Sequence, residues 1–295
     1  MTRVTSDRER APLDGWTIAA IAVVVYILSN LGHEGVGHGG ACLLVGGRGE
    51  MLNAVYFECD EARLSAAGVR WLAAAGSLAN LLLAGMAWIA LRRGERLRPD
   101  LRFALVLLLA VNLLQAFGYL LFSGVGRVGD WATVFDGLMP EWIWRIGLVL
   151  VGGWLYFVVA PGLFMPLLEP FLGREQPARE ERAQELTLLP YLAGGLAYLL
   201  AGMLNPHGWR LVLISAAAAS LGGTSLLAWY PPLWARRPGR TGVGEPLAIR
   251  RSVGWLIASA IVLCFFVLIL GPGISFGAPA GSTERPLSGG FSGRA

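Results

Sequence analysis

Long apolar runs constrain this chain more than any other feature. Seven of them can be recognised, at residues 16–45, 69–91, 102–123, 142–168, 186–204, 210–230 and 252–273. They are long enough to cross a hydrocarbon core of ~30 Å, which takes about 20 helical residues. Charged residues make up only 15% of the chain, too few to cover the surface of a water-soluble domain. The sequence therefore predicts an all-α polytopic membrane protein with about seven transmembrane helices in the lipid bilayer.

The distribution of arginine predicts the orientation. All 24 basic residues are arginine, and 16 of them fall in the N-terminal segment and in the loops at 92–102, 170–185 and 231–251. These segments share one side of the membrane if all seven runs span it. Because cytoplasmic loops are enriched in basic residues, we expect a multi-pass cell-membrane protein with a cytoplasmic N-terminus. This arrangement accounts for the net charge of +4, so we do not expect nucleic-acid binding.

The segment at 46–68, between the first two runs, has the composition of a small β-hairpin rather than a linker. Cys42 and Cys59 flank its first half on the outer side, where they can form a disulfide. We divide the chain into a cytoplasmic segment (1–15), a core with the candidate site (16–140), further transmembrane helices (141–273) and a disordered tail (274–295). The alanine- and glycine-rich stretch at 215–223 is interpreted as a surface for close helix packing.

Ionisable residues cluster at the outer end of the first run. Burying an ionisable group in a membrane costs free energy, so such residues are functional candidates. They are His33, Glu34 and His38, and Asp130 emerges at the same face after the outward-running third helix. Two imidazoles and one carboxylate leave the fourth tetrahedral position of a zinc ion for water. We therefore interpret His33, His38 and Asp130 as Zn²⁺ ligands. Glu34 is then the general base of a hydrolase.

The two histidines are five positions apart, one more than in the common HExxH motif. On a regular α-helix this spacing leaves the two side chains roughly 140° apart, which is unsuitable for a shared ion. A π-helical turn, with hydrogen bonds between residues five apart, would bring them to one face. Gly35 and Gly37 permit such a distortion. Metal binding by this sequence therefore requires a π-bulge between His33 and His38.

Two stretches resemble the site-2 protease family of intramembrane zinc metallopeptidases. They are HEGVGH at 33–38, followed by LLVGGR at 43–48, and AAAGSLANLLLA at 73–84. The last is similar to that family's helix AGPLANLLLA, with Ser77 in place of proline. The resemblance covers about residues 16–140 and implies an endopeptidase that cleaves membrane-anchored protein substrates. The family's Asp-Gly ligand motif also keeps Asp136 open as an alternative to Asp130.

Asn80, in the middle of the second helix, is a candidate for contact with the substrate, although buried asparagines also form hydrogen bonds between helices. The alternative function is a non-catalytic relative that binds membrane proteins through the same groove and needs no metal. A transporter is disfavoured, because the buried polar residues gather toward one face and the second half offers no inverted repeat. The sequence leaves the oligomeric state open.

Overall fold

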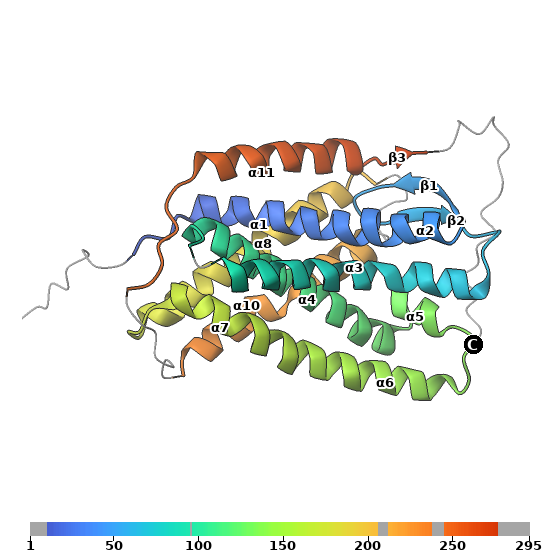
Figure 1. The fold of residues 1–295 in the computed structure, drawn as a ribbon, viewed down its shortest axis with the longest axis horizontal. Helices are drawn as coiled ribbons and strands as arrows, with labels where there is room; N and C mark the ends of the chain where they lie inside the picture. The colour runs from blue at the N-terminus through green and yellow to red at the C-terminus, as the bar shows by residue number, and fades with distance from the viewer. Residues whose placement is uncertain (1–10, 95, 206–211, 238–244, 277–295) are drawn as a thin grey trace, which may run out of the picture.

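The computed structural model describes residues 11–94, 96–205, 212–237 and 245–276. Within these residues, six helices are long and apolar enough to cross a membrane: Gly15–Leu44, Ala66–Arg93, Pro99–Gly126, Glu141–Leu172, Ala178–Gly202 and Val253–Leu270. Their axes run broadly along the long dimension of the molecule (Figure 1). The predicted all-α polytopic fold is therefore confirmed.

Some of these spans combine α-helical and π-helical elements. The first contains α1 (Gly15–Asn30), η1 (Leu31–Gly39) and α2 (Gly40–Leu44), and the fourth contains α6 (Glu141–Trp154), η2 (Leu155–Val159) and α7 (Ala160–Leu172). The last contains α11 (Val253–Phe265) and η4 (Phe266–Leu270), whereas α3 (Ala66–Arg93), α4 (Pro99–Gly126) and α8 (Ala178–Gly202) are each a single helix.

The predicted run at 210–230 corresponds to the π-helix η3 (Val212–Gly222), followed by α10 (Leu226–Ala235). The beginning of this run lies outside the described residues. The structure therefore gives six full-length candidate spans in the described part of the chain, with η3 and α10 as a further helical segment beside them.

A small antiparallel sheet follows the first span. Strands β1 (Arg48–Leu52) and β2 (Phe57–Asp60) pair as the predicted hairpin. A third strand, β3 (Ile274–Ser275), pairs with the other side of β1, so the strand order is β2-β1-β3. The prediction that the tail is disordered is therefore wrong for Ile274 and Ser275. Because η4 ends beside the hairpin, these residues reach β1 and pair with it. Residues 277–295 lie outside the described residues.

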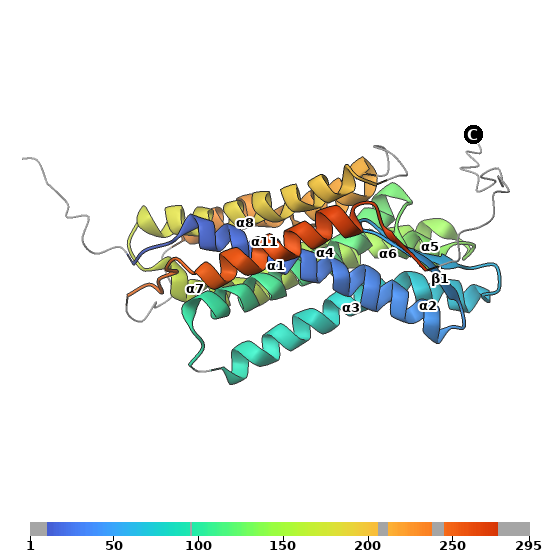
Figure 2. The same cartoon turned by 90° about the horizontal axis from the view of Figure 1, so that it is seen from above.

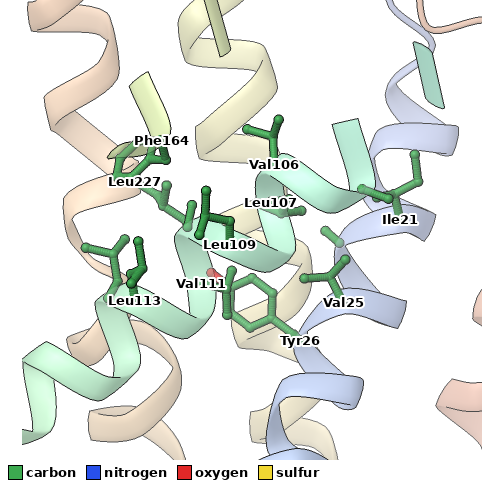
Figure 3. Close-up of a cluster of buried hydrophobic side chains, with 14 of the residues drawn as sticks. Ile21, Val25, Tyr26, Val106, Leu107, Leu109, Val111, Leu113, Phe164 and Leu227 are labelled. Carbon is green, nitrogen blue, oxygen red and sulfur yellow. The ribbon is translucent and has the colours of Figure 1, made fainter. Parts of the chain in front are cut away.

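The apolar core joins the N-terminal and C-terminal halves of the chain. In Figure 3, Tyr26 of α1 and Leu109 of α4 lie in the same cluster as Phe164 of α7 and Leu227 of α10. Tyr26 is fully buried, and its hydroxyl lies 2.8 Å from Thr224 Oγ1, so its polar end is satisfied. The helices thus pack as one bundle, with α1 beside α8 and α11, and α4 beside α3 and α6.

Large apolar side chains cover much of the outer surface of the bundle. Leu82 of α3 is 60% exposed and Leu150 of α6 is 67% exposed. On a water-soluble protein, contiguous apolar surface of this kind would favour aggregation. On a membrane protein it is the expected surface toward lipid.

The described parts of the predicted arginine-rich segments lie at one end of the bundle. Asp14 N donates to Ile249 O over 2.8 Å, and Arg251 Nε lies 3.0 Å from Asp14 Oδ2. The turn between α7 and α8 lies at this end too, whereas the sheet and the short helix α5 (Asp130–Phe135) lie at the other (Figures 1 and 2). The described parts of the segments that were predicted to share one side of the membrane therefore lie at the same end of the bundle.

The predicted loop at 170–185 is shorter than expected, because α8 already begins at Ala178. Arg179 and Arg182 are consequently buried helical residues rather than loop residues. Arg179 pairs with Glu169 over 2.7 Å, and Arg182 donates to the carbonyl oxygens of Phe171 and Leu247. These partners compensate for the loss of hydration that burial of a guanidinium group entails.

Candidate metal centre

The π-helix η1 brings the two histidines together. It extends from Leu31 to Gly39, and the backbone N–H of Gly40 reaches Gly35 O, five residues back. His33 Nε2 and His38 Nε2 lie 3.2 Å apart, with the two rings edge to face. The predicted π-helical distortion is confirmed. It brings the two imidazoles to one face of the helix although they are five residues apart.

Helix α3 approaches η1 closely enough that only glycine fits at two positions. A Cβ on Gly37 would lie 2.7 Å from Gly76 Cα, so the two backbones are in direct contact. A Cβ on Gly76 would lie 2.5 Å from His38 Nε2 and 2.6 Å from His33 Nε2. The glycine of the AAAGSLAN segment therefore provides the space that both imidazoles occupy.

Asp130 completes the cluster from the start of α5. A sharp turn after α4 directs the chain back, with Arg127 at φ 57° and Gly129 at φ 86°. Positive φ angles suit glycine, which has no Cβ to clash with the backbone. Asp130 Oδ2 lies 3.2 Å from His33 Nε2 and 3.6 Å from His38 Nε2.

Asp136, the alternative ligand, lies elsewhere. It is exposed at the end of α5, and its backbone carbonyl accepts a hydrogen bond from Arg70 Nη2 over 2.9 Å. The structure thus brings Asp130, rather than Asp136, to the histidines. Burial acts to raise the pKa of the Asp130 carboxyl, but the adjacent imidazoles of His33 and His38 outweigh this effect and lower it. A carboxylate that stays ionised is the form that binds a cation.

The donor atoms of these three residues fit a tetrahedral metal ion. Bond lengths of ~2.0–2.1 Å to zinc place tetrahedral ligand atoms about 3.3 Å from one another, close to the 3.2, 3.2 and 3.6 Å observed between the three donors. His38 Nδ1 lies 2.8 Å from Leu72 O. Because a carbonyl oxygen only accepts, Nδ1 carries the proton and the Nε2 lone pair is free for a metal.

Glu34 lies beside the three ligands and is held by the sheet. It is buried, with only 6% of its surface exposed. Its Oε2 accepts a hydrogen bond from Phe57 N of β2 over 2.9 Å, and its Oε1 lies 4.0 Å from His33 Nε2. A disulfide between Cys42 of α2 and Cys59 of β2, a pairing that the sequence allowed, fastens the same strand to the first span.

A cavity of about 580 Å³ opens beside this cluster. Glu34, His38 and Asp130 line it together with Phe57 of β2. Other lining residues come from α4 (Tyr119), from η2 (Phe157), from η3 (Ala218, Ala219 and Gly222) and from the adjoining Gly223. The alanine- and glycine-rich stretch that was interpreted as packing surface therefore also lines the cavity. The sequence did not predict this contribution of the C-terminal half to the cavity.

Asn80 lies in a different environment from the other candidates. It is fully buried, and its Nδ2 lies 3.5 Å from Gln115 Oε1 of α4. The described residues that line the cavity do not include it. This contact is the hydrogen bond between helices that the sequence left open as its alternative role, and contact with a substrate stays a prediction.

No protein-family model, curated protein or solved structure matches this chain. The resemblance to site-2 proteases therefore rests on the motifs at 33–38 and 73–84. What the geometry adds is a group of two imidazoles and one carboxylate that can hold a metal ion.

Proposed function

We propose that this protein is a zinc-dependent intramembrane endopeptidase that cleaves membrane-anchored protein substrates, as a divergent relative of the site-2 proteases. The observation that carries this proposal is the convergence of the donor atoms of His33, His38 and Asp130 beside the buried carboxylate of Glu34. Such a set has three protein ligands, an open fourth position and a nearby base, which are the parts of a catalytic rather than a structural zinc site.

Glu34 is the general base in this proposal. His33, His38 and Asp130 would hold a zinc ion, which would act as a Lewis acid and lower the pKa of a bound water molecule. Glu34 takes one proton from the water as the water oxygen bonds to the peptide carbonyl carbon. It then gives this proton to the amide nitrogen as the C–N bond breaks. The products are a carboxylic acid and an amine, and Glu34 is again ionised.

Strand β2 is the proposed docking edge for the substrate. It is the outer strand of the sheet, paired with β1 on one side. Phe57 and Cys59 of this strand line the cavity next to Glu34 and His38. An extended peptide that adds to such an edge gains backbone hydrogen bonds independent of its sequence. An extended segment is also the conformation in which a peptide bond is accessible to a protease.

We further infer that the site faces the extracytoplasmic side of the cell membrane and that the N-terminus is cytoplasmic. The disulfide between Cys42 and Cys59 lies at the end of the bundle that carries the site, and disulfides persist in oxidising compartments. The arginine-rich segments gather at the opposite end, as expected for a cytoplasmic face. The two arguments are independent and agree.

The experiment that tests the proposal combines zinc content with cleavage. Wild type, His33→Ala and Glu34→Gln are purified in detergent for zinc measurement, and new N-termini of membrane proteins are identified by mass spectrometry in cells expressing each variant. We expect one zinc per chain in wild type and Glu34→Gln, little in His33→Ala, and new N-termini with wild type alone. Equal zinc in wild type and His33→Ala would remove the metal site. Cleavage by Glu34→Gln would remove the base assignment.

The non-catalytic alternative makes the opposite prediction in the same experiment. A relative that only binds membrane proteins through the cavity needs no stoichiometric metal, and Glu34→Gln would not change what it retains. Co-purification of the same membrane proteins with wild type and Glu34→Gln, without zinc and without new N-termini, would favour it.

A further inference from the structure

A hydrogen bond connects helix α3 with the residue that follows Asp130. Trp131 Nε1 donates to Ser77 Oγ over 3.0 Å, and Ser77 is almost completely buried. Ser77 stands where the similar helix of site-2 proteases carries proline, whose side chain cannot accept a hydrogen bond. This contact is therefore a property of the present chain.

Asp130 depends on its surroundings for its position, because α5 cannot fix it alone. The helix has six residues, all of them at least partly exposed. Isolated helices of this length are unstable, so tertiary contacts must hold them. The preceding residue, Gly129, is the most permissive residue type for the backbone. The direction of the Asp130 carboxylate is consequently set by what anchors the first turn of α5.

Trp131 and the aromatic contacts beyond it are among the anchors of α5. The Trp131 ring stacks near Phe135 with centroids 6.4 Å apart, and Phe135 stacks on Trp144 of α6 at 4.9 Å. These stacks hold α5 against α6. The hydrogen bond to Ser77 instead holds α5 against α3, the helix whose Gly76 contacts both histidines. Arg70 of α3 also bonds to the carbonyl of Asp136 at the far end of α5, but the Ser77 contact ties the first turn of α5, next to Asp130, to that helix.

We propose that Ser77 and Trp131 are positioning residues that hold Asp130 at the metal and thereby set the affinity for zinc. The inference rests on the proposed metal site and concerns affinity rather than the chemical step. Neither side chain supplies a donor atom to the cluster. Outer contacts of this kind typically change metal affinity by about 10- to 100-fold when they are removed.

The test is a chelator competition for zinc with the purified full-length protein in detergent. Trp131→Phe keeps the aromatic stack and removes the N–H group, and Ser77→Ala removes the acceptor. We expect each to weaken zinc binding about 10-fold or more, and the double variant to lose no more than either single one, because both remove the same bond. Ser77→Thr retains the hydroxyl and should restore most of the affinity. Trp142→Phe, at a residue of α6 that is 62% exposed, is the matched control.

The outcomes separate this inference from the proposed function. If wild type binds zinc and Ser77→Ala and Trp131→Phe bind it equally well, the positioning role is overturned while the metal site stands. If Ser77→Ala weakens binding further in an Asp130→Asn background, the residue does not act through Asp130 and the inference is likewise overturned. If wild type itself binds no zinc, the proposed function fails first. Thermal unfolding of each variant checks that a loss of affinity is not a loss of folding.

Discussion

His33 Nε2 and His38 Nε2 lie 3.2 Å apart although the two residues are five positions apart in the chain. The π-helix η1 accounts for this distance, since the hydrogen bonds of a π-helix connect residues five positions apart. The extra residue relative to HExxH is thereby absorbed by the backbone, and both imidazoles face one point. The HExxxH sequence is for this reason compatible with a working metal centre and need not be a degenerate one.

The first prediction concerns Gly76, which faces both imidazoles. Gly76→Ala should weaken zinc binding by at least about 10-fold, because the added Cβ would lie 2.5–2.6 Å from the two Nε2 atoms and displace the rings. Gly85→Ala, on the same helix, is the matched control, since its Cβ would meet no atom within 4 Å. Zinc titration of both purified variants checks the prediction. Equal affinities would mean that the rings do not occupy these positions.

The second prediction separates the two candidate aspartates. Asp130→Asn should weaken zinc binding by more than the ~10- to 100-fold typical of outer contacts, because it removes a charged ligand atom 3.2 Å from His33 Nε2. Asp136→Asn should leave the affinity unchanged, because that side chain is exposed and remote from the cluster. Zinc content after dialysis against a chelator measures both. A reversal of the two effects would return the ligand role to Asp136.

Much of this arrangement could be predicted from the sequence because the signals are local. Hydropathy depends on neighbouring residues, so the long spans and the β-hairpin follow from their own composition. The π-helix between His33 and His38 could be predicted because two imidazoles that share an ion must lie on one face, and an α-helix does not place residues five apart on one face. The side of the membrane on which Cys42 and Cys59 were predicted to lie made their pairing possible, and the structure contains the bond.

The remaining features depend on contacts between distant parts of the chain. Strand β3 has two residues, and it exists because η4 ends beside β1. Asp130 was predicted as the ligand with Asp136 as the alternative, and the turn at Gly129 accounts for why Asp130 is the one that reaches the histidines. The alanine- and glycine-rich stretch of η3 has a composition that suits close packing and cavity lining equally. Only the assembled bundle distinguishes these roles.

The third prediction concerns the disulfide. In unfolded, unreduced protein a maleimide should label one thiol per chain, Cys264, and after reduction it should label three. Cys42→Ser should expose Cys59 and give two labelled thiols without reduction. The bond closes a loop of 17 residues, so its loss should reduce the free energy of unfolding by about 3 kcal/mol in the chain-entropy treatment. Three labelled thiols before reduction would exclude the bond.

The fourth prediction concerns Asp14, the N-cap of α1. Its Oδ1 accepts hydrogen bonds from Thr17 N and Thr17 Oγ1, and its Oδ2 pairs with Arg251. Asp14→Ala should reduce the free energy of unfolding by about 1 kcal/mol. Asp14→Asn, which keeps an acceptor for the cap, should cost less. Thermal midpoints in detergent compare the two variants, and equal losses would assign the effect to the ion pair instead.

The pH dependence of the same residue follows from its environment. Burial acts to raise the pKa of Asp14, but hydrogen bonds from Thr17 and Arg251 outweigh it and lower the pKa. Because the pKa is lowered, the stabilisation by the carboxylate is fully present at any pH above the ordinary pKa of aspartate. It is lost as the pH falls through the pKa of Asp14 in the folded protein. The difference between wild type and Asp14→Ala should therefore be constant near neutral pH and shrink only in acid.

The last prediction tests the orientation of the bundle. Met139 lies in the loop between α5 and α6, at the end that carries the site, and is 82% exposed. Arg237 is exposed after α10, at the arginine-rich end. In a Cys264→Ser background, a membrane-impermeant maleimide should label Met139→Cys in intact cells, whereas Arg237→Cys should react only after the membrane is permeabilised. The control is the background without an added cysteine, which should stay unlabelled because Cys42 and Cys59 are paired. The opposite pattern would place the candidate metal centre toward the cytoplasm, and it would leave a disulfide in a compartment that keeps thiols reduced.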